Sequence, residues 1–253
     1  MLQTHTDDSH TFASMLRNAR RAVVFTGAGM STESGLPDFR SGDGLWKQNR
    51  RFQELASTDA LEHLYPEFVE FYRFRIRMLD GVRPNTGHTI LAGWQRAGIV
   101  QSIITQNVDG LHENAGCRDV LGLHGSLRRI RCRGCSSDMP SSAFLEEAGT
   151  RCGRCRDVMR PSVVLYGEAL DSRTLDEAVA QSRAADLFVV LGSSLSTSPA
   201  NSLPRLAMEA GAPLVIVNRE PTPLSSLAAL DVRGRIGATL TAVDQLLGAR
   251  RPR

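Results

Sequence analysis

The segment that decides the fold is AVVFTGAGMSTESG, residues 22–35. Its first five residues form a continuous apolar run that ends at a glycine, which is typical of a strand buried on both faces of a parallel sheet. The turn Gly27-Ala28-Gly29 follows and opens a predicted helix, so its backbone N–H groups would face a phosphate group at the positive end of the helix dipole. The segment therefore predicts an α/β fold with a phosphate site directly after its first strand.

The same turn departs from the G-x-G-x-x-G fingerprint of dehydrogenases, because Thr32 stands where the third glycine is expected. No strand with an acidic residue at its end follows about 20 residues later, where a dehydrogenase holds the adenine ribose. We therefore expect dinucleotide binding at this turn, but not simple hydride transfer.

Strands and helices are predicted to alternate along most of the chain. The other apolar runs predicted as buried parallel strands are 99–107, 161–167, 185–194 and 212–218. Helical patterns occupy 11–21, 85–97, 172–184, 199–210 and 239–250, and Pro204 is expected to kink the fourth of these helices or to delay its start. This alternation predicts a Rossmann-like, doubly wound α/β parallel sheet.

Two segments interrupt the alternation and are expected to form a smaller, inserted lobe. Residues 40–84 contain no convincing strand and one helical stretch near 66–79, and residues 128–160 contain four closely spaced cysteines. We expect a helical module from the first segment and a zinc module from the second. The larger α/β lobe would then consist of residues 11–39, 85–127 and 161–253.

Two C-x2-C pairs have the spacing of a four-thiolate zinc site. The pairs are Cys132 with Cys135 and Cys152 with Cys155, and sixteen residues separate them. Four cysteine ligands leave no coordination position open, so the zinc ion would be structural. The alternatives are two disulfides or a redox site, which the absence of a signal-peptide pattern and of a strand before either pair disfavours.

The composition is that of an ordinary globular protein, since 42% of the 253 residues are hydrophobic and 23% are charged. It excludes a disordered or fibrous chain. No run approaches the ~18–20 apolar residues of a membrane span, and the first residues lack a signal-peptide pattern, so we expect a cytoplasmic protein. The net charge of +3 lies far from that of a dedicated nucleic-acid binder, and the Arg-rich run 128–133 is expected to be a solvated face.

Polar side chains follow several predicted strands at their carboxyl ends, where ligands bind in open α/β sheets. Asn107 and Asp109 alternate after one strand, and an amide beside a carboxylate suits recognition of a carboxamide such as nicotinamide. An Asx-turn that caps the next helix is the alternative for these two residues. The run Gly192-Ser193-Ser194 and Asn218 end two later strands, so together these positions predict one ligand crevice.

His124 lies between Gly122 and Gly125, outside any helical pattern, and is a better candidate for a general base than His88 or His112. A satisfied structural histidine is the alternative. The loop 36–46 carries glycines and aromatic residues without periodicity, so we expect a functional lid rather than a plain surface loop.

Six sequence motifs and two C-x2-C pairs occur in an order that resembles the sirtuins, the NAD-dependent protein deacylases. They are GAGMSTESGLPDFR, TQNVDGLH, LHGS, the two C-x2-C pairs, RPSVVLYGE, LGSSLS and VNRE. The resemblance runs from about residue 12 to about residue 247. It implies that residues 1–253 form a single sirtuin catalytic domain, in which the large lobe binds NAD and the small lobe holds one structural zinc ion.

The resemblance also implies roles for individual residues. Gly27, Ala28 and Gly29 would hold the NAD phosphates, Gly192, Ser193, Ser194 and Asn218 would lie on the adenosine side, and Phe39 and Arg40 would belong to a mobile cofactor loop. Gln106, Asn107 and Asp109 would line the nicotinamide-ribose pocket, with His124 as the catalytic base. Val164, Leu165, Tyr166, Gly167 and Glu168 would offer a strand edge to an extended acyl-lysine peptide.

The implied activity is NAD-dependent deacylation of protein lysines, which releases nicotinamide and O-acyl-ADP-ribose. Val108, Ser193 and Tyr166 differ from the residues common in the family but preserve their shape. The partners would be acyl-lysine proteins or peptides, with no specific nucleic acid and no membrane, and the chain would be a monomer. ADP-ribosyl transfer to a protein nucleophile is the alternative activity, and the near-neutral charge disfavours a non-catalytic zinc-ribbon module that binds nucleic acid.

The helical stretch 66–79 contains residues that could determine which acyl group is bound. Phe68, Tyr72, Arg75 and Leu79 fall on one stripe of this helix. The pair Tyr72 and Arg75 is similar to the pair with which desuccinylase-like sirtuins bind an acidic acyl chain, and a guanidinium beside a phenol suits a carboxylate. The alternative is a solvated Arg75, because the helix carries other arginines and the chain uses Arg almost wherever it needs a cation.

Overall fold

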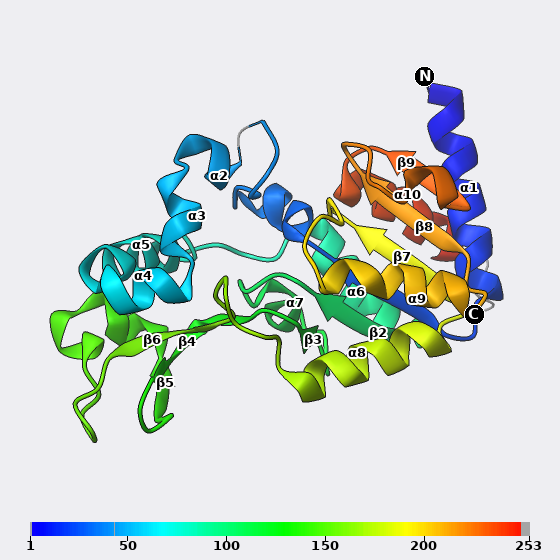
Figure 1. Cartoon of the computed structure of the whole chain (residues 1–253). Coiled ribbons are helices and arrows are strands. Elements are labelled where there is room, and N and C mark those ends of the chain that lie inside the picture. The colour runs from blue at the N-terminus through cyan, green and yellow to red at the C-terminus, as the bar shows by residue number, and fades with distance from the viewer. Residues whose placement is uncertain (1, 43, 249–253) are drawn as a thin grey trace.

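The computed structural model describes residues 2–42 and 44–248, which fold around two sheets (Figure 1). The larger sheet has six strands in the order β3-β2-β1-β7-β8-β9, and every neighbouring pair is parallel. Its strands are β1 (Ala22–Thr26), β2 (Val100–Thr105), β3 (Leu121–Gly122), β7 (Leu187–Leu191), β8 (Leu214–Asn218) and β9 (Leu230–Arg233). The strand order reverses at β1, which lies between β2 and β7, so a topological switch point for ligand binding falls at the carboxyl end of β1.

Helices cover both faces of the larger sheet, as a doubly wound fold requires. One face carries α1 (Leu2–Asn18), α6 (Thr86–Arg96) and α10 (Ile236–Gly248), and the other carries α8 (Ser172–Ala184) and α9 (Leu203–Glu209). The side chains of β1 alternate between the two cores, since Val24 packs with the first set of helices and Val23 and Phe25 pack with the second. The continuous apolar run therefore reflects burial on both faces.

The smaller sheet is antiparallel, with the strand order β5-β4-β6. Its strands are β4 (Gly125–Cys132), β5 (Asp138–Pro140) and β6 (Met159–Val163). Helices α2 (Leu45–Gln48), α3 (Arg51–Leu55), α4 (Thr58–His63) and α5 (Tyr65–Arg77) lie on the same side of the molecule (Figure 1). Phe68 and Tyr72 of α5 share a hydrophobic core with Ile130, Phe144 and Met159, so the helical segment and the cysteine-rich segment pack as one lobe.

The remaining described elements are short. They are α7 (Leu111–Asn114) and the 3-10 helices η1 (Ala28–Ser34), η2 (Ser141–Leu145), η3 (Glu147–Thr150), η4 (Ala200–Ser202) and η5 (Ser225–Leu227). Pro204 lies in the first turn of α9, so it delays the start of the helix, which η4 precedes. No helix in residues 2–42 and 44–248 is long and apolar enough to cross a membrane.

The sequence analysis placed one strand in the wrong sheet. The run 161–167 was expected in the parallel sheet, but β6 ends at Val163 and pairs antiparallel with β4, and residues 164–167 form a loop. An apolar run indicates burial without indicating the partner, and β6 is buried against the core that it shares with α5. Strands β4 and β6 also cross the lobe bounds placed at 127/128 and 160/161, which remain a proposal.

Four strands, the short helices α2, α3, α4 and α7, and some helix ends were not predicted. Strands β3, β5 and β9 have two, three and four residues, too few for a hydrophobic pattern to stand out. Strand β4 was not predicted because its Arg-rich residues were expected to be a solvated face. Helix α1 begins at Leu2 rather than at residue 11. The last helix begins at Ile236 rather than at residue 239, and the predicted residues 249–250 lie outside the described part of the chain.

Candidate active site

A cavity of about 570 Å³ lies at the carboxyl ends of the parallel strands and reaches the small lobe. Four strand ends contribute to it through Gly27 after β1, Gln106 after β2, Gly192 after β7 and Asn218 at the end of β8. The predicted site residues among its lining are Gly27, Ala28, Gly29, Phe39, Arg40, Tyr72, Arg75, Gln106, Asn107, His124, Val164, Leu165, Tyr166, Gly167, Glu168, Gly192, Ser193, Ser194 and Asn218. Residues that are far apart in the sequence therefore meet in one cavity.

The turn after β1 packs tightly against the turn after β7. The N–H of Gly29 donates to the carbonyl oxygen of Gly192 at 2.9 Å, and a Cβ atom at position 29 would lie 2.7 Å from the Cα of Gly192. Gly192 has a positive φ of 62°. Both glycines are therefore required by the close approach of two backbones. The helix opened by the turn is the seven-residue 3-10 helix η1 rather than an α-helix.

A buried polar network lies directly below this turn. The Nδ2 of Asn107 donates to the carbonyl oxygen of Gly27 at 3.0 Å and to the hydroxyl of Ser31 at 3.1 Å. The Ser31 hydroxyl in turn donates to Oδ2 of Asp109 at 2.7 Å, and Oδ1 of Asp109 accepts from the N–H of Leu111 at 2.9 Å. The helix-capping alternative for Asp109 is therefore present, and the same carboxylate also binds Ser31.

Asp109 does not line the main cavity, in contrast to the prediction. It lines a smaller cavity of about 40 Å³, together with Ala28, Phe39, Arg75 and Asn107. These four neighbours also line the main cavity, so the small cavity is a recess behind it. The sequence analysis gave the helix-capping Asx-turn as the alternative for Asp109, but it did not indicate the recess that the residue lines.

His124 is held in the tautomer that a general base needs. Its Nδ1 lies 3.0 Å from the carbonyl oxygen of Gln106, and because a carbonyl only accepts, Nδ1 carries the proton and Nε2 keeps a lone pair. Burial lowers the pKa of His124, Arg40 lowers it further, and the hydrogen bond to Gln106 opposes both without outweighing them. The imidazole is therefore neutral at pH 7 and lines the cavity.

The buried histidines His88 and His112 do not line the main cavity. Their ring centroids lie 4.8 Å apart, and burial lowers their pKa values to about 4 and about 3. Nδ1 of His88 accepts from the backbone of Asn85 in the capping box of α6, and Nε2 of His112 lies 2.9 Å from the hydroxyl of Thr26. Both rings belong to the interior of the large lobe.

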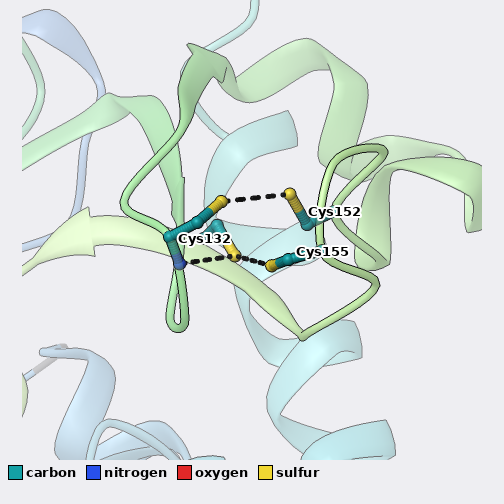
Figure 2. Close-up of side chains that lie close together, drawn as sticks. Cys132, Cys152 and Cys155 are labelled. Atoms are coloured by element: carbon teal, nitrogen blue, oxygen red, sulfur yellow. Dashed lines mark hydrogen bonds between the residues drawn. The ribbon is translucent and has the colours of Figure 1, made fainter.

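The four cysteines converge in the small lobe. Their sulfur atoms lie within 4.8 Å of one another, with Cys132 and Cys155 at 3.3 Å and Cys135 and Cys152 at 3.6 Å. Figure 2 shows the sulfur atoms of Cys132, Cys152 and Cys155 turned toward one another. These distances exclude disulfide bonds of about 2.05 Å and fit a tetrahedron of zinc–sulfur bonds of about 2.3 Å, whose sulfur atoms lie about 3.8 Å apart. None of the four lines the cavity, so a zinc ion here is structural.

Comparison with known proteins agrees with this geometry. A model of the Sir2 family matches residues 27–199. The chain belongs to the Sir2 family. The chain is 52% identical over 241 residues to NAD-dependent protein deacetylase 1 of Geobacillus kaustophilus. This alignment covers 94% of this chain and 98% of that protein. The chain is 40% identical over 244 residues to NAD-dependent protein deacylase 2 of Archaeoglobus fulgidus, with 94% and 95% covered.

Solved structures of Sir2 proteins have the same fold. A Sir2 enzyme superposes with a TM-score of 0.88 at 40% identity, covering 97% of this chain and 99% of that one. A Sir2 complex with a p53 peptide and NAD superposes with a TM-score of 0.84 at 35% identity, covering 94% and 98%. This sirtuin is therefore an NAD-dependent protein deacetylase or deacylase, with NAD as co-substrate and a four-cysteine structural zinc site.

Of the three arginines on α5 of this sirtuin, Arg75 is the one that lines the cavity. Its guanidinium lies 5.2 Å from the ring centroid of Phe39 and 5.8 Å from that of Phe71, and it has no hydrogen bond or ion pair within the described chain. Arg73 instead binds Glu70, Glu147 and the carbonyl oxygen of Phe144. Arg75 is half-buried beside these two rings, whereas Arg77 is exposed.

Tyr72 lies beside Arg75 and is 1% exposed. Burial raises the pKa of Tyr72 to about 12, so its hydroxyl keeps its proton at pH 7. Burial lowers the pKa of Arg75, and Tyr72 and Asp109 oppose that change. The cavity wall therefore offers a phenol donor and a cation with no anionic partner among the described side chains.

The segment 164–168 is a loop rather than the predicted open strand edge. Val164 N–H donates to the carbonyl oxygen of His124 at 2.9 Å. Tyr166 N–H donates to the carbonyl oxygen of Ala56 at 2.9 Å, and the Tyr166 carbonyl oxygen accepts from Thr58 at 3.0 Å. Within the described chain the N–H and C=O of Gly167 have no hydrogen-bond partner.

Several lining residues were not predicted as site residues, among them Thr32, Glu33, Thr197, Arg219, Glu220, Gly234 and Ile236. Asp38, Ser41 and Trp46 also line the cavity and lie in the loop 36–46 that was expected to be a functional lid. Gly234 and Ile236 follow β9, and that strand was too short to recognise, so its carboxyl end was not considered. Glu33 accepts from the N–H of Gly237 at 2.9 Å and thereby ties η1 to the start of α10. The signal for Arg219 and Glu220 was present, because they follow Asn218 directly.

Proposed function

We propose that this sirtuin removes acyl groups from protein lysines with His124 as the general base. The observation that carries the proposal is the tautomer of His124, whose Nδ1–H is held by Gln106 and whose Nε2 is free to take a proton in the cavity. When bound, NAD supplies the ADP-ribosyl group that accepts the acyl group and nicotinamide as the leaving group. The products would be deacylated lysine, nicotinamide and O-acyl-ADP-ribose.

The remaining lining residues support binding of both substrates in this cavity. Gly27, Ala28 and Gly29 present backbone close to the cavity, as close approach of a pyrophosphate requires, and Ser193, Ser194 and Asn218 would contact the adenosine part. Asn107, held by Gly27 and Ser31, would orient the nicotinamide ribose. Phe39 and Arg40, on the loop between η1 and α2, would close over the cofactor. Positioning of the two substrates supplies much of the rate enhancement in such transfers.

We further propose that the acyl pocket accepts an acidic acyl chain such as succinyl. Arg75 supports this because it is a half-buried cation with no anionic partner among residues 2–42 and 44–248, beside the protonated Tyr72 hydroxyl. Hydrogen bonds to a charged group contribute about 1.5–3 kcal/mol. A carboxylate on the acyl chain would then gain about 10- to 100-fold in kcat/KM from this pair.

The acyl preference is tested by the ratio of kcat/KM for succinyl over acetyl peptide. We expect this ratio to fall about 10- to 100-fold in Arg75→Met, because the cation is lost while the side-chain volume is kept. Arg77→Met is the matched control, since Arg77 is exposed on the same helix and lies outside the cavity. Equal ratios in the wild type and Arg75→Met would leave the pair without a role and make the protein a deacetylase only.

ADP-ribosyl transfer to a protein nucleophile is separated from deacylation by mass spectrometry. An acyl-lysine peptide incubated with the protein and NAD should lose its acyl group while O-acyl-ADP-ribose accumulates. A peptide that keeps its acyl group and gains the mass of ADP-ribose would overturn the proposal in favour of the transferase.

A further inference from the structure

The loop that follows β6 is closed by a buried arginine that takes no part in the proposed chemistry. Arg160 is 4% exposed, and its Nη1 and Nη2 bind the two carboxylate oxygens of Glu168, the second at 3.0 Å. Nη2 also donates to the carbonyl oxygen of Val163, and Nε donates to that of Pro161 at 3.3 Å. One guanidinium thus contacts both ends of the loop.

Glu168 completes the closure from the other end of the loop. Its Oε2 accepts from the N–H of Leu165 at 2.9 Å, and its own N–H donates to the carbonyl oxygen of Leu165 at 3.0 Å. Residues 165–168 therefore form a tight turn, in which Gly167 has a φ of +96° as the third residue of a type II turn requires. A Cβ atom at position 167 would lie 2.5 Å from Oγ1 of Thr58.

The turn holds Gly167 at the cavity wall with its peptide groups unpaired. Gly167 lines the cavity, and its N–H and C=O have no partner within the described chain, whereas the N–H groups of Leu165, Tyr166 and Glu168 are all engaged. An extended peptide pairs through such free backbone groups, and their direction is set by the turn. The conformation of this turn depends on Glu168, and the position of Glu168 depends on its ion pair with Arg160.

Both charges of this pair are satisfied only in the closed loop. Burial raises the pKa of Glu168, but the hydrogen bonds from Arg160 and Leu165 outweigh burial and hold it below its usual value. The carboxylate therefore remains ionised at pH 7. A lysine at position 160 would offer a single ammonium group and not the planar fork that contacts Glu168 and Val163 together.

We propose that Arg160 is a positioning residue for the acyl-lysine peptide, which acts by fixing the Gly167 peptide groups through Glu168. The inference rests on the proposed deacylase function and adds a determinant of peptide binding to it. Arg160 itself touches neither the cavity nor His124, so its effect should appear in peptide binding and not in the chemical step.

The test compares KM for an acetyl-lysine peptide, KM for NAD and kcat in Arg160→Gln, Arg160→Lys and Glu168→Gln. We expect the peptide KM to rise by up to about 100-fold, because misplacing a group by about 1 Å can cost about that much, while the NAD KM and kcat change far less. Arg160→Lys should be intermediate. Because both residues act through one contact, the double variant Arg160→Gln/Glu168→Gln should raise the peptide KM no further than the worse single variant.

Arg73→Gln is the matched control for lost stability. Arg73 is 12% exposed, binds two glutamates and the carbonyl oxygen of Phe144 in the same lobe, and lies outside the cavity. A comparable fall in melting temperature with an unchanged peptide KM is expected for it. If Arg160→Gln does not yield folded protein, Arg160→Lys and Glu168→Gln carry the test.

Binding of a fluorescein-labelled acetyl-lysine peptide, measured by anisotropy, separates the two possible failures. A wild type that neither deacylates nor binds this peptide would overturn the proposed function and this inference with it. An active wild type whose peptide KM is unchanged in the folded Arg160 variants, or rises equally in Arg73→Gln, overturns the inference alone.

Discussion

Replacement of Asp109 by asparagine perturbs the polar network below the cavity while preserving its shape. The carboxylate accepts two hydrogen bonds, from the Ser31 hydroxyl at 2.7 Å and from Leu111 N–H at 2.9 Å. Asparagine offers one acceptor oxygen and one donor group in the same places. The Ser31 oxygen already accepts from Asn107, so with an amide group opposite it the Ser31 hydroxyl proton would have no acceptor.

The expected loss of stability follows from the one hydroxyl proton that the variant leaves without an acceptor. Leaving one buried donor unsatisfied costs about 1–3 kcal/mol. In a protein of this size each kcal/mol lowers the melting temperature by about 2–4 °C, so the fall should be about 2–12 °C. Because Ser31 also holds the amide of Asn107, the variant should weaken NAD binding in addition to stability.

Differential scanning calorimetry and isothermal titration with NAD measure the two effects. Asp138→Asn is the control, since Asp138 is 43% exposed on β5 and pairs with Arg129 away from the cavity. We expect it to change the melting temperature and the NAD affinity little. An Asp109→Asn protein as stable as the wild type, with unchanged NAD affinity, would refute the description of this network.

Three further predictions concern His124 and the zinc site. His124→Ala should lower kcat/KM by about 10²–10⁴-fold while titration still shows NAD binding, and near-normal turnover would exclude the histidine as the base. Burial and the charge of Arg40 lower the pKa of His124, so the active neutral form persists below pH 6.5. Arg40→Gln should therefore raise this pKa and move the acid limb of the kcat/KM profile toward higher pH. An acid limb that stays in place or moves to lower pH would contradict this. Cys152→Ser, or removal of zinc by a chelator, should loosen the small lobe and lower the thermal transition; an active wild type without bound metal would show that no structural zinc is needed.

Local chemistry made much of the fold and site predictable. Strands β1, β7 and β8 are continuous apolar runs because helices bury both faces of a parallel sheet, and α8 begins and ends where its pattern predicted. The spacing of the C-x2-C pairs predicts a zinc site directly, because each pair places two ligands on one tight turn. His124 could be selected because its flanking glycines exclude a helical setting, although its tautomer depends on Gln106.

Contacts between distant segments decided the rest. The apolar run at 161–167 predicted burial, but only packing against α5 determined that β6 joins the antiparallel sheet. Arg73, Arg75 and Arg77 are the same residue type on one helix, and the position of the cavity distinguishes Arg75. The closure of the 163–168 loop by Arg160 and Glu168 has no periodic signature, because an ion pair across a turn depends on the direction of two side chains and not on their spacing. Hydrophobic periods and ligand spacings are short-range properties that a sequence displays directly, whereas the partner of a charge and the wall of a cavity exist only once the chain has brought distant residues together.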